Sequence, residues 1–225
     1  WGKFYTHWLK RFFQVENPMS EYPKYILQYG AAGVIEKQIS KLALVLRSED
    51  WLKIPPSRTI DINTPLPAKA KKIYKKVEKT LIHSLEDGTE IYAPSHGVLT
   101  NKLAQITGGA CYVQEAENDS TRRVEHIHDA KIKALVKLKK ELRKEPLLVA
   151  CHYRHEIERI LAAFPSAKKF ESHLLEDWNR GKIDMIVSHP KSIGHGLNMQ
   201  HGCKNVCWFS LGYSRALYDQ FNARV

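Results

Sequence analysis

The chain has 225 residues, of which 43% are hydrophobic and 26% charged, so it is long enough to bury the core of one or two globular domains. No apolar run approaches the roughly 18–20 residues that a membrane span needs, and no signal peptide is visible, which argues against a membrane protein. The 35 basic residues outnumber the 24 acidic ones, and the net charge of +11 favours a polyanionic partner, with nucleic acid first.

The cysteines and the chain ends give two further expectations. Cys111, Cys151, Cys203 and Cys207 lie mostly among apolar neighbours, which predicts reduced core thiols in an intracellular protein. The chain begins at Trp1 and stops at Val225 inside a helical pattern that has no terminating residue. We therefore expect a piece of a longer protein.

Residues 1–57 are rich in aromatic residues and helix formers, and Pro55-Pro56 closes this section. A helix is predicted over residues 34–47, because Ile35, Ile39, Leu42 and Leu46 recur near helical spacing. The sequence RTIDINTPL, residues 58–66, alternates apolar and polar side chains and predicts a strand.

A long helix is predicted from Pro67, a residue suited to the first turn of a helix. One stripe of this helix is apolar, and the remaining positions are mostly lysine: Lys69, Lys71, Lys72, Lys75, Lys76 and Lys79. These lysines form either a solvated face or a surface that follows phosphates, and the sequence leaves both readings open. Under the second reading Lys71, Lys72 and Lys75 contact nucleic acid.

Three segments precede the regular second half of the chain. Residues 86–90 (EDGTE) predict a turn, and 98–113 (VLTNKLAQITGGACYV) predict a helix that ends at Gly108 and Gly109. The polar residues 114–128 predict an exposed loop.

From Asp129, a good helix N-cap, helices alternate with short and continuously apolar strands. Helices are predicted at 130–144, 155–164, 174–180 and 214–225, and strands at 147–151, 183–188 and 206–210. This order predicts an α/β fold with a parallel sheet covered on both faces. Such sheets bind ligands outside the carboxyl ends of their strands.

One of those strand ends carries the loop SHPKSIGHGLNMQ, residues 188–200. Gly194 and Gly196 allow the backbone to approach a ligand and its N–H groups to cradle phosphate, although a tight strand exit also requires glycine. In the last predicted helix Gln220 and Arg224 are four residues apart and share a face. An arginine there suits phosphoryl-transfer chemistry, and the alternative is an ordinary surface pair.

Metal and nucleophile chemistry are disfavoured. His195, His201, Cys203 and Cys207 match no standard zinc spacing, and Cys207 lies inside a buried strand pattern, so no metal site is predicted. Ser192 lacks the Gly-x-Ser-x-Gly context of a nucleophile.

Residues 129–225 resemble the second RecA-like lobe of Swi/Snf-type ATPases in helicase superfamily two, and the phage-encoded members most closely. The segment EPLLVACHYRHEIERIL resembles motif IV, IDMIVSHPKSIGHGLNMQHG resembles motif V, and LYDQFNARV resembles the first half of motif VI. Upstream, ISKLALVLRSEDWLKIPP resembles the helical segment that joins the lobes, and LTNKLAQITGGACY resembles helices inserted before lobe two.

The resemblance implies three regions: a linker segment over 1–57, a strand with a helical insertion over 58–128, and the lobe proper over 129–225. It implies that Gly194, Gly196 and Asn198 form the motif V turn near nucleotide and DNA. Gln220 and Arg224 would face the nucleotide bound on the other lobe, and Ser188 and Lys191 would lie along the DNA. His195 replaces a residue that is usually small in the family and receives no role.

The 225 residues contain neither a G-x-x-x-x-G-K-[ST] loop nor the acidic box that holds magnesium. The resemblance therefore implies that ATP and Mg2+ are held mainly by a first RecA-like lobe of the same protein, and that this chain alone is inactive. The intact protein would be an ATP-dependent DNA helicase or translocase that follows the backbone of double-stranded DNA in the cytoplasm of a bacterial or phage-infected cell. Two alternatives remain: a non-catalytic basic nucleic-acid-binding module on a RecA-like scaffold, and a small α/β enzyme for a phosphorylated metabolite.

Overall fold

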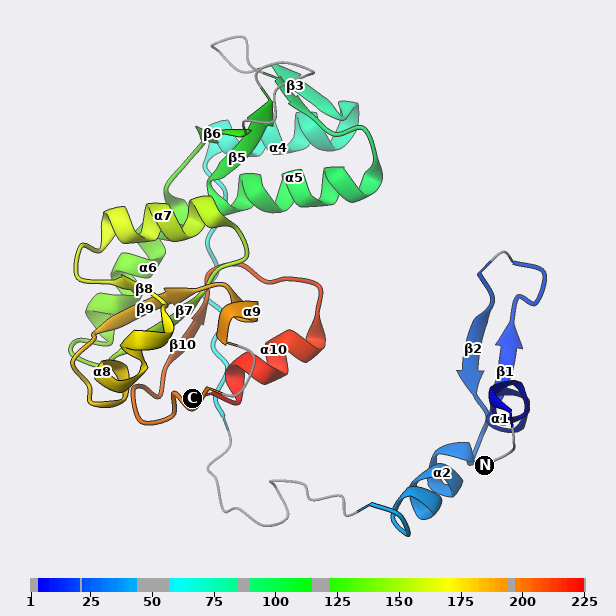
Figure 1. The fold of residues 1–225 in the computed structure, drawn as a ribbon. Helices are drawn as coiled ribbons and strands as arrows, with labels where there is room; N and C mark the ends of the chain where they lie inside the picture. The colour runs from blue at the N-terminus through cyan, green and yellow to red at the C-terminus, as the bar shows by residue number, and fades with distance from the viewer. Residues whose placement is uncertain are drawn as a thin grey trace. The chain divides into compact units, whose positions relative to one another are not determined.

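The computed structural model describes residues 4–20, 22–43, 57–84, 90–114, 122–193 and 197–224. The chain divides into two compact units, Trp1–Ile60 and Asp61–Val225. Each unit has its own secondary structure (Figure 1).

The described residues of the first unit form two helices and a hairpin. They are α1 (Tyr5–Phe12), β1 (Phe13–Glu16), β2 (Lys24–Leu27) and α2 (Ala31–Ile39), and the two strands pair antiparallel. The predicted helix over 34–47 is wrong at both ends, because α2 starts at Ala31 and stops at Ile39, and residues 44–47 lie outside the described part of the chain. Ser40 Oγ donates to Lys37 O, a local bond that competes with helix continuation, and Leu42 is left 78% exposed.

The second unit is built on a parallel sheet of four strands. They are β7 (Leu147–Ala150), β8 (Lys168–Lys169), β9 (Met185–Ser188) and β10 (Val206–Trp208), in the order β10-β7-β9-β8. All three pairings are parallel. The strands are flanked by α6 (Ala130–Glu141), α7 (Arg154–Ala163), α8 (Leu175–Asn179), α9 (Pro190–Ile193) and α10 (Arg215–Asn222).

Alternating side chains of the central strands supply two cores, one on each face of the sheet. Leu147 and Val149 pack in a cluster with residues of α6 and α7, which include Ile132, Leu135, Ile157 and Ile160. Leu148 and Ala150 pack in a second cluster with residues of α8, α9 and α10, which include Trp178, Ile193 and Phe221. The predicted α/β fold, with a parallel sheet covered on both faces, is therefore confirmed.

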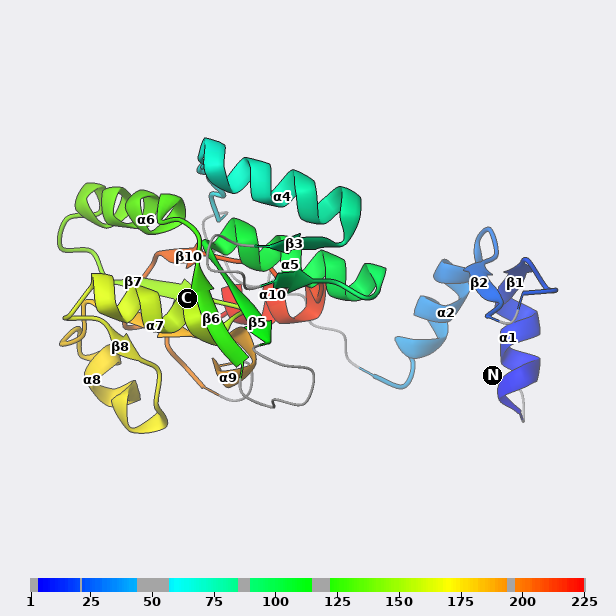
Figure 2. The same ribbon diagram turned by 90° about the horizontal axis from the view of Figure 1, so that it is seen from above.

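A smaller module precedes the sheet. It contains α4 (Ala68–Thr80), β3 (Ile82–Ser84), β4 (Glu90–Tyr92), α5 (His96–Gly108), β5 (Ala110–Gln114) and β6 (Arg122–His126). Its helices α4 and α5 lie side by side (Figure 2), and Ile73, Val77, Ile91 and Ile106 form its core. The helix predicted from Pro67 is confirmed, and so is the end of α5 at Gly109, which has φ 99°.

Two predictions for this region are wrong. Residues 58–66 form no strand: Ile60 and Ile62 are 69% and 51% exposed, and Pro65 and Pro67 have no N–H to donate to a ladder. The predicted loop over 114–128 contains β6, which pairs antiparallel with β5 and places Cys111 opposite Glu125. Most of the predicted turn at 86–90 lies outside the described residues, although β3 and β4 on either side pair antiparallel.

The other boundaries agree with the predictions to within a few residues. Cys111, Cys151 and Cys203 are buried, Cys207 is half-buried, and all four are free thiols, as predicted. Among the described helices, none combines the length and the apolar character needed to cross a membrane.

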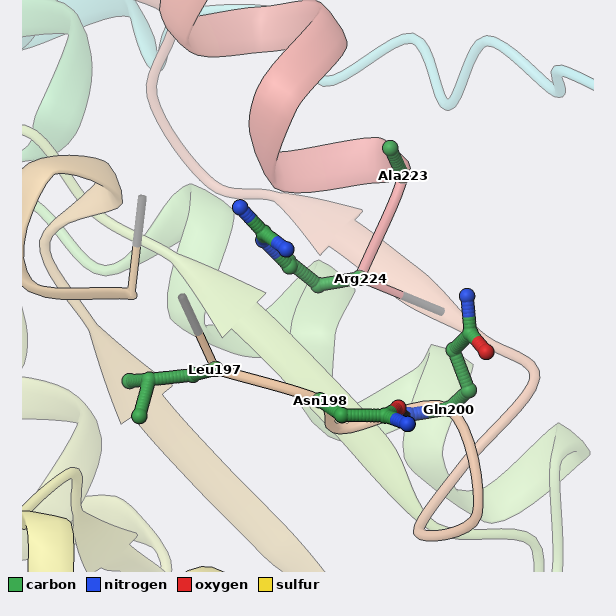
Figure 3. A pocket seen from close by; sticks show the side chains of 5 residues that line it. All are labelled: Leu197, Asn198, Gln200, Ala223 and Arg224. Atoms are coloured by element: carbon green, nitrogen blue, oxygen red, sulfur yellow. Dashed lines mark hydrogen bonds between the residues drawn. The ribbon is translucent and has the colours of Figure 1, made fainter. Parts of the chain in front are cut away.

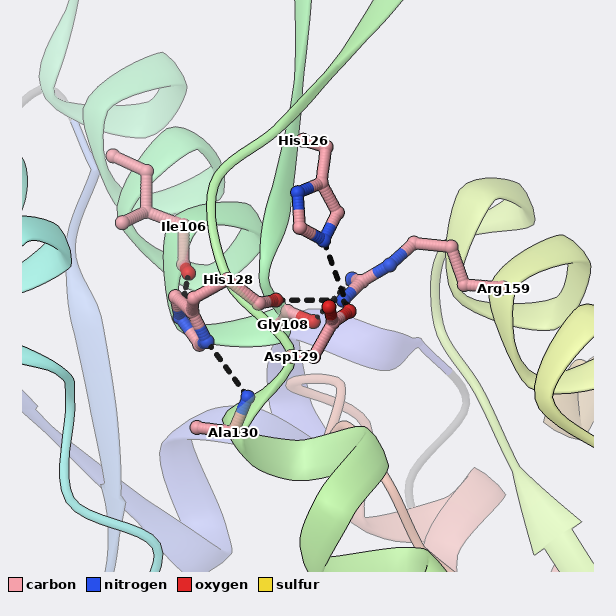
Figure 4. Close-up of polar contacts among 7 residues, drawn as sticks. All are labelled: Ile106, Gly108, His126, His128, Asp129, Ala130 and Arg159. Atoms are coloured by element: carbon pink, nitrogen blue, oxygen red, sulfur yellow. Dashed lines mark hydrogen bonds and ion pairs between the residues drawn. The ribbon is translucent and has the colours of Figure 1, made fainter.

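Arg159 joins the module to the sheet-bearing part of the unit (Figure 4). From α7 its guanidinium donates to Gly108 O and to His128 O, both at 2.7 Å, and it pairs with Asp129 at 2.9 Å. His126 bonds the same carboxylate oxygen at 2.9 Å, and these two partners hold the pKa of Asp129 below its usual range.

Asp129 consequently does not cap α6 through its side chain, contrary to the prediction. His128 takes that role: its Nδ1 accepts from the N–H of Ala130 at 3.2 Å, while its Nε2 bonds Ile106 O. Gly109 lies at the centre of this junction, where a Cβ atom would meet His128 O at 2.2 Å and the Arg159 guanidinium at 2.6 Å. The junction thus fixes the end of α5 against α7.

We expect Arg159→Leu to lower the free energy of unfolding by about 2–3 kcal/mol, because two carbonyls are deprived of charged donors. The matched control is Arg154→Leu on the same helix, where the exposed pair with Glu158 is removed at a cost of no more than about 0.5 kcal/mol. Urea titrations followed by circular dichroism measure both values. Equal destabilisation in the two variants would contradict a stabilising role of the Arg159 hydrogen bonds.

Candidate functional site

The described residues of the second unit line at least two pockets. The first, here called the loop–helix pocket, has a volume of about 270 Å3 and is lined by Leu197, Asn198, Gln200, Ala223 and Arg224 (Figure 3). The second, here called the strand-end pocket, has a volume of about 350 Å3 and is lined by His152, Tyr153, Arg154, Ile157, Lys169, Phe170, Ser188, His189 and Ser192.

One wall of the loop–helix pocket is formed by residues 197–200, which precede β10. Asn198 Oδ1 accepts from the N–H of Gln200 at 3.2 Å, and Asn198 O accepts from Asn179 Nδ2 at 2.8 Å. Met199 O accepts from Trp178 Nε1 at 3.2 Å. These bonds tie the segment to α8 and fix the position of the Asn198 side chain.

The same wall depends on a close backbone approach at Gly202. A Cβ atom at this position would lie 2.1 Å from Nε1 of the fully buried Trp178. Only glycine fits without displacing the indole. The sequence carries no local signal for this approach, because Trp178 lies on α8, far away in the chain.

The opposite wall is the end of α10. Ser214 caps this helix by accepting from the N–H of Leu217, and Phe221 anchors it in the core. Trp208 on β10 donates to Asn222 Oδ1 at 2.9 Å, which fixes the last turn. In Figure 3 the half-buried Arg224 side chain lies across the pocket from Leu197 and Asn198.

The structure brings two of the predicted site residues together, since Asn198 and Arg224 line one pocket. The predicted helix face shared by Gln220 and Arg224 is wrong, because α10 ends at Asn222 and Arg224 N bonds Phe221 O in the following turn. Gln220 is exposed and is not a lining residue. Gly194, His195 and Gly196 lie outside the described residues.

The strand-end pocket collects residues from three parallel strands where each one ends. His152 follows β7, Lys169 is the last residue of β8, and Ser188 ends β9. Ser188 is buried and donates to His189 O at 3.1 Å, so it forms part of the wall. Lys191 is exposed on α9 beside the pocket, and its N–H donates to His189 Nδ1 at 3.1 Å.

Glu156, which was not predicted as a site residue, holds the backbone of two residues that line this pocket. Its Oε2 accepts from the N–H groups of His152 and Tyr153 and from the Ser210 hydroxyl. Burial raises the pKa of Glu156, and these hydrogen bonds oppose the rise. The available signal was an acidic residue near the start of the helix predicted at 155–164. The observed α7 starts at Arg154, which makes Glu156 its third residue, a position that commonly binds the N-terminal backbone.

All six lysines of the predicted basic face are exposed on α4: Lys69, Lys71, Lys72, Lys75, Lys76 and Lys79. The opposite side of the helix buries Ala70, Ile73 and Val77, as predicted from their spacing. Within the described ranges, no three histidine, cysteine, aspartate or glutamate side chains gather as a metal site would require.

The fold defines an α/β domain with a parallel sheet, and the strand-end pocket lies at the carboxyl edge of that sheet. No protein-family model matches the chain. The chain is 35% identical over 227 residues to a protein named p41 from Acyrthosiphon pisum secondary endosymbiont phage 1, and the match covers 100% of this chain and 47% of the relative. The chain thus spans about half the length of the curated relative it matches.

Among solved structures, the helicase domain of Hef from Pyrococcus furiosus is similar at a TM-score of 0.36 and 19% identity. That match covers 44% of this chain and 23% of the other. A similarity at this level carries no argument about function.

Proposed function

We propose that this chain is the second lobe of an ATP-dependent DNA helicase or translocase, working with a first RecA-like lobe of the same protein. The observation that carries the proposal is that Asn198 and Arg224, which belong to two separate motif-like segments, line one pocket. Only the fold brings these two segments together.

The lining of the loop–helix pocket suits the phosphates of a nucleotide. The planar guanidinium of Arg224 can form two parallel hydrogen bonds to phosphate oxygens, and the Asn198 and Gln200 amides add neutral donors. Mg2+ is assigned to the first lobe, which would also hold most of the ATP. In this proposal Gly194 and Gly196 bring backbone close to the nucleotide, and Gln220 faces the other lobe.

ATP hydrolysis tests the proposal. The 225-residue chain and the protein encoded by its whole natural reading frame are purified, and ATP turnover is measured with and without duplex DNA. We expect DNA-stimulated turnover by the whole protein and none by the 225-residue chain. Steady turnover by the chain alone, or a whole protein that contains no phosphate-binding loop, would overturn the two-lobe assignment.

The basic face of α4 supports DNA as the partner, and a salt titration tests it. We expect the triple variant Lys71→Ala/Lys72→Ala/Lys75→Ala to bind duplex DNA with a shallower log–log salt dependence. The slope should fall by up to about one for each phosphate that the variant no longer neutralises. The effect should not depend on DNA sequence, because lysine–phosphate pairing carries no base information.

The control variant removes the same charge from exposed lysines of the first unit: Lys10→Ala/Lys37→Ala/Lys41→Ala. It should leave the slope unchanged. An unchanged slope in the α4 variant would mean that these lysines form only a solvated face and do not contact DNA.

A further inference from the structure

The polar lining of the strand-end pocket is cationic. Arg154, Lys169, His152 and His189 supply the nitrogen groups, Ser188 and Ser192 supply hydroxyls, and none of the lining residues is acidic. Ile157 and Phe170 are buried in its wall, which lowers the local polarity. A pocket of this kind fits an oxyanion such as phosphate.

Two imidazoles face each other in this pocket. The ring centroids of His152 and His189 are 5.4 Å apart, with 38° between the planes. Because His189 Nδ1 accepts the Lys191 N–H, the neutral ring carries its proton on Nε2. Both rings are half-buried and belong to residues that follow neighbouring strands.

His152 is held in place from three sides. Its backbone N–H donates to Glu156 Oε2 and to Ser210 Oγ. Its ring meets the edge of Tyr153 with centroids 5.1 Å apart, and a Cβ atom on Gly212 would lie 3.0 Å from its Nδ1. The pair is therefore preorganised and does not need to form when a ligand arrives.

The surroundings of His189 disfavour its imidazolium form in the free protein. Burial lowers the pKa of His189, and His152 and Lys191 lower it further. Lys169 and Arg154 add positive charge, although Arg154 is paired with Glu158 at 2.8 Å. The carboxylate of Glu156 accepts from the backbone N–H of His152 and from the Ser210 hydroxyl.

We propose that the strand-end pocket binds one phosphate group of the nucleic-acid backbone, and that the His152–His189 pair takes up a proton as it does so. The inference rests on the proposed function for the source of the phosphate. An anion within reach of both rings reverses the local field and favours the charged imidazole. Because the rings interact, the proton belongs to the pair. Affinity for nucleic acid then rises as the pH falls.

The test is fluorescence anisotropy with a labelled DNA duplex at pH 8 and pH 6, at constant ionic strength, on the 225-residue chain. One proton taken up changes affinity by up to about tenfold per pH unit, and we expect a gain of about fivefold or more between these two pH values. The double variant His152→Gln/His189→Gln should bind the duplex with the same affinity at pH 8 and at pH 6. The α4 lysine variant should bind it more weakly at both pH values, while the ratio of the two affinities stays the same.

Ser192→Asp keeps both rings and places a carboxylate in the same pocket, so it tests the site if the double variant fails to fold. This variant should also lose the gain in duplex affinity between pH 8 and pH 6. A gain that persists in a folded double variant, or in Ser192→Asp, would overturn the assignment.

Proton NMR of the histidine rings, titrated with inorganic phosphate, separates this inference from the proposed function. Duplex binding with equal affinity at both pH values overturns the proton uptake and leaves the helicase lobe intact. If the chain does not bind duplex DNA but inorganic phosphate shifts the ring signals of His152 and His189, the pocket binds free phosphate. That result overturns nucleic acid as the source of the phosphate. If neither response occurs, the pocket is not an anion site.

Discussion

Under the proposed two-lobe assignment, ATP turnover by the whole protein is expected to fall by about a thousandfold or more when Arg224 is replaced by alanine. The guanidinium lies half-buried in the loop–helix pocket, and the turn that follows α10 holds its backbone through the bond from Arg224 N to Phe221 O. Such a group stabilises charge that develops in the transition state, so the decrease should appear mainly in kcat. Arg224→Lys should also abolish most activity, because an ammonium cannot form the paired bonds of the planar fork.

Arg215→Ala is the matched control for this experiment. Arg215 lies on the same helix, is exposed, and pairs with Asp219 at 2.8 Å. Turnover by this variant should stay within about twofold of the parent, because an exposed ion pair contributes little. A comparable decrease in both variants, or an active Arg224→Ala protein with unchanged stability, would remove Arg224 from the nucleotide site.

Replacing Trp178 with alanine is expected to lower the free energy of unfolding by about 3–5 kcal/mol. The indole is 0% exposed and belongs to the core beneath the sheet face that α8, α9 and α10 cover. The substitution opens a large cavity and removes the donor to Met199 O. Because the segment carrying Asn198 is tied to α8 there, the loop–helix pocket should lose its shape as well.

Tyr213→Ala serves as the control for size and aromaticity. Tyr213 is 78% exposed, and its removal should change the stability by no more than about 0.5 kcal/mol. Urea titrations followed by circular dichroism compare the two variants. If Trp178→Ala were as stable as Tyr213→Ala, Trp178 would not be packed in the core between α8 and the sheet.

The central strands were predictable because burial on both faces leaves a continuous apolar run, as in Leu147–Ala150 and Met185–Ser188. The edge strand β8 was missed, since it consists of two exposed lysines and carries no apolar signal. The β5–β6 hairpin was missed for a related reason: β6 is rich in charged residues, and only its pairing with β5 makes it a strand.

The site was predictable only in part. Asn198 and Arg224 came from spacing and from the resemblance, and the fold brings them together. His152, Lys169 and His189 were not predicted as a group, because they follow three strands whose neighbourhood depends on the strand order in the sheet. Glu156 and Gly202 act through distant segments that no local pattern reveals.

The Arg159 junction has a mechanical consequence. The helix α7 starts at the strand-end pocket, and one to two turns later its Arg159 binds the end of α5 through Gly108 O and the residue before the N-cap of α6 through His128 O. The helix α7 therefore couples the module that carries the lysine face of α4 to the carboxyl edge of the sheet. Any movement of the sheet should therefore carry the lysine helix α4 with it.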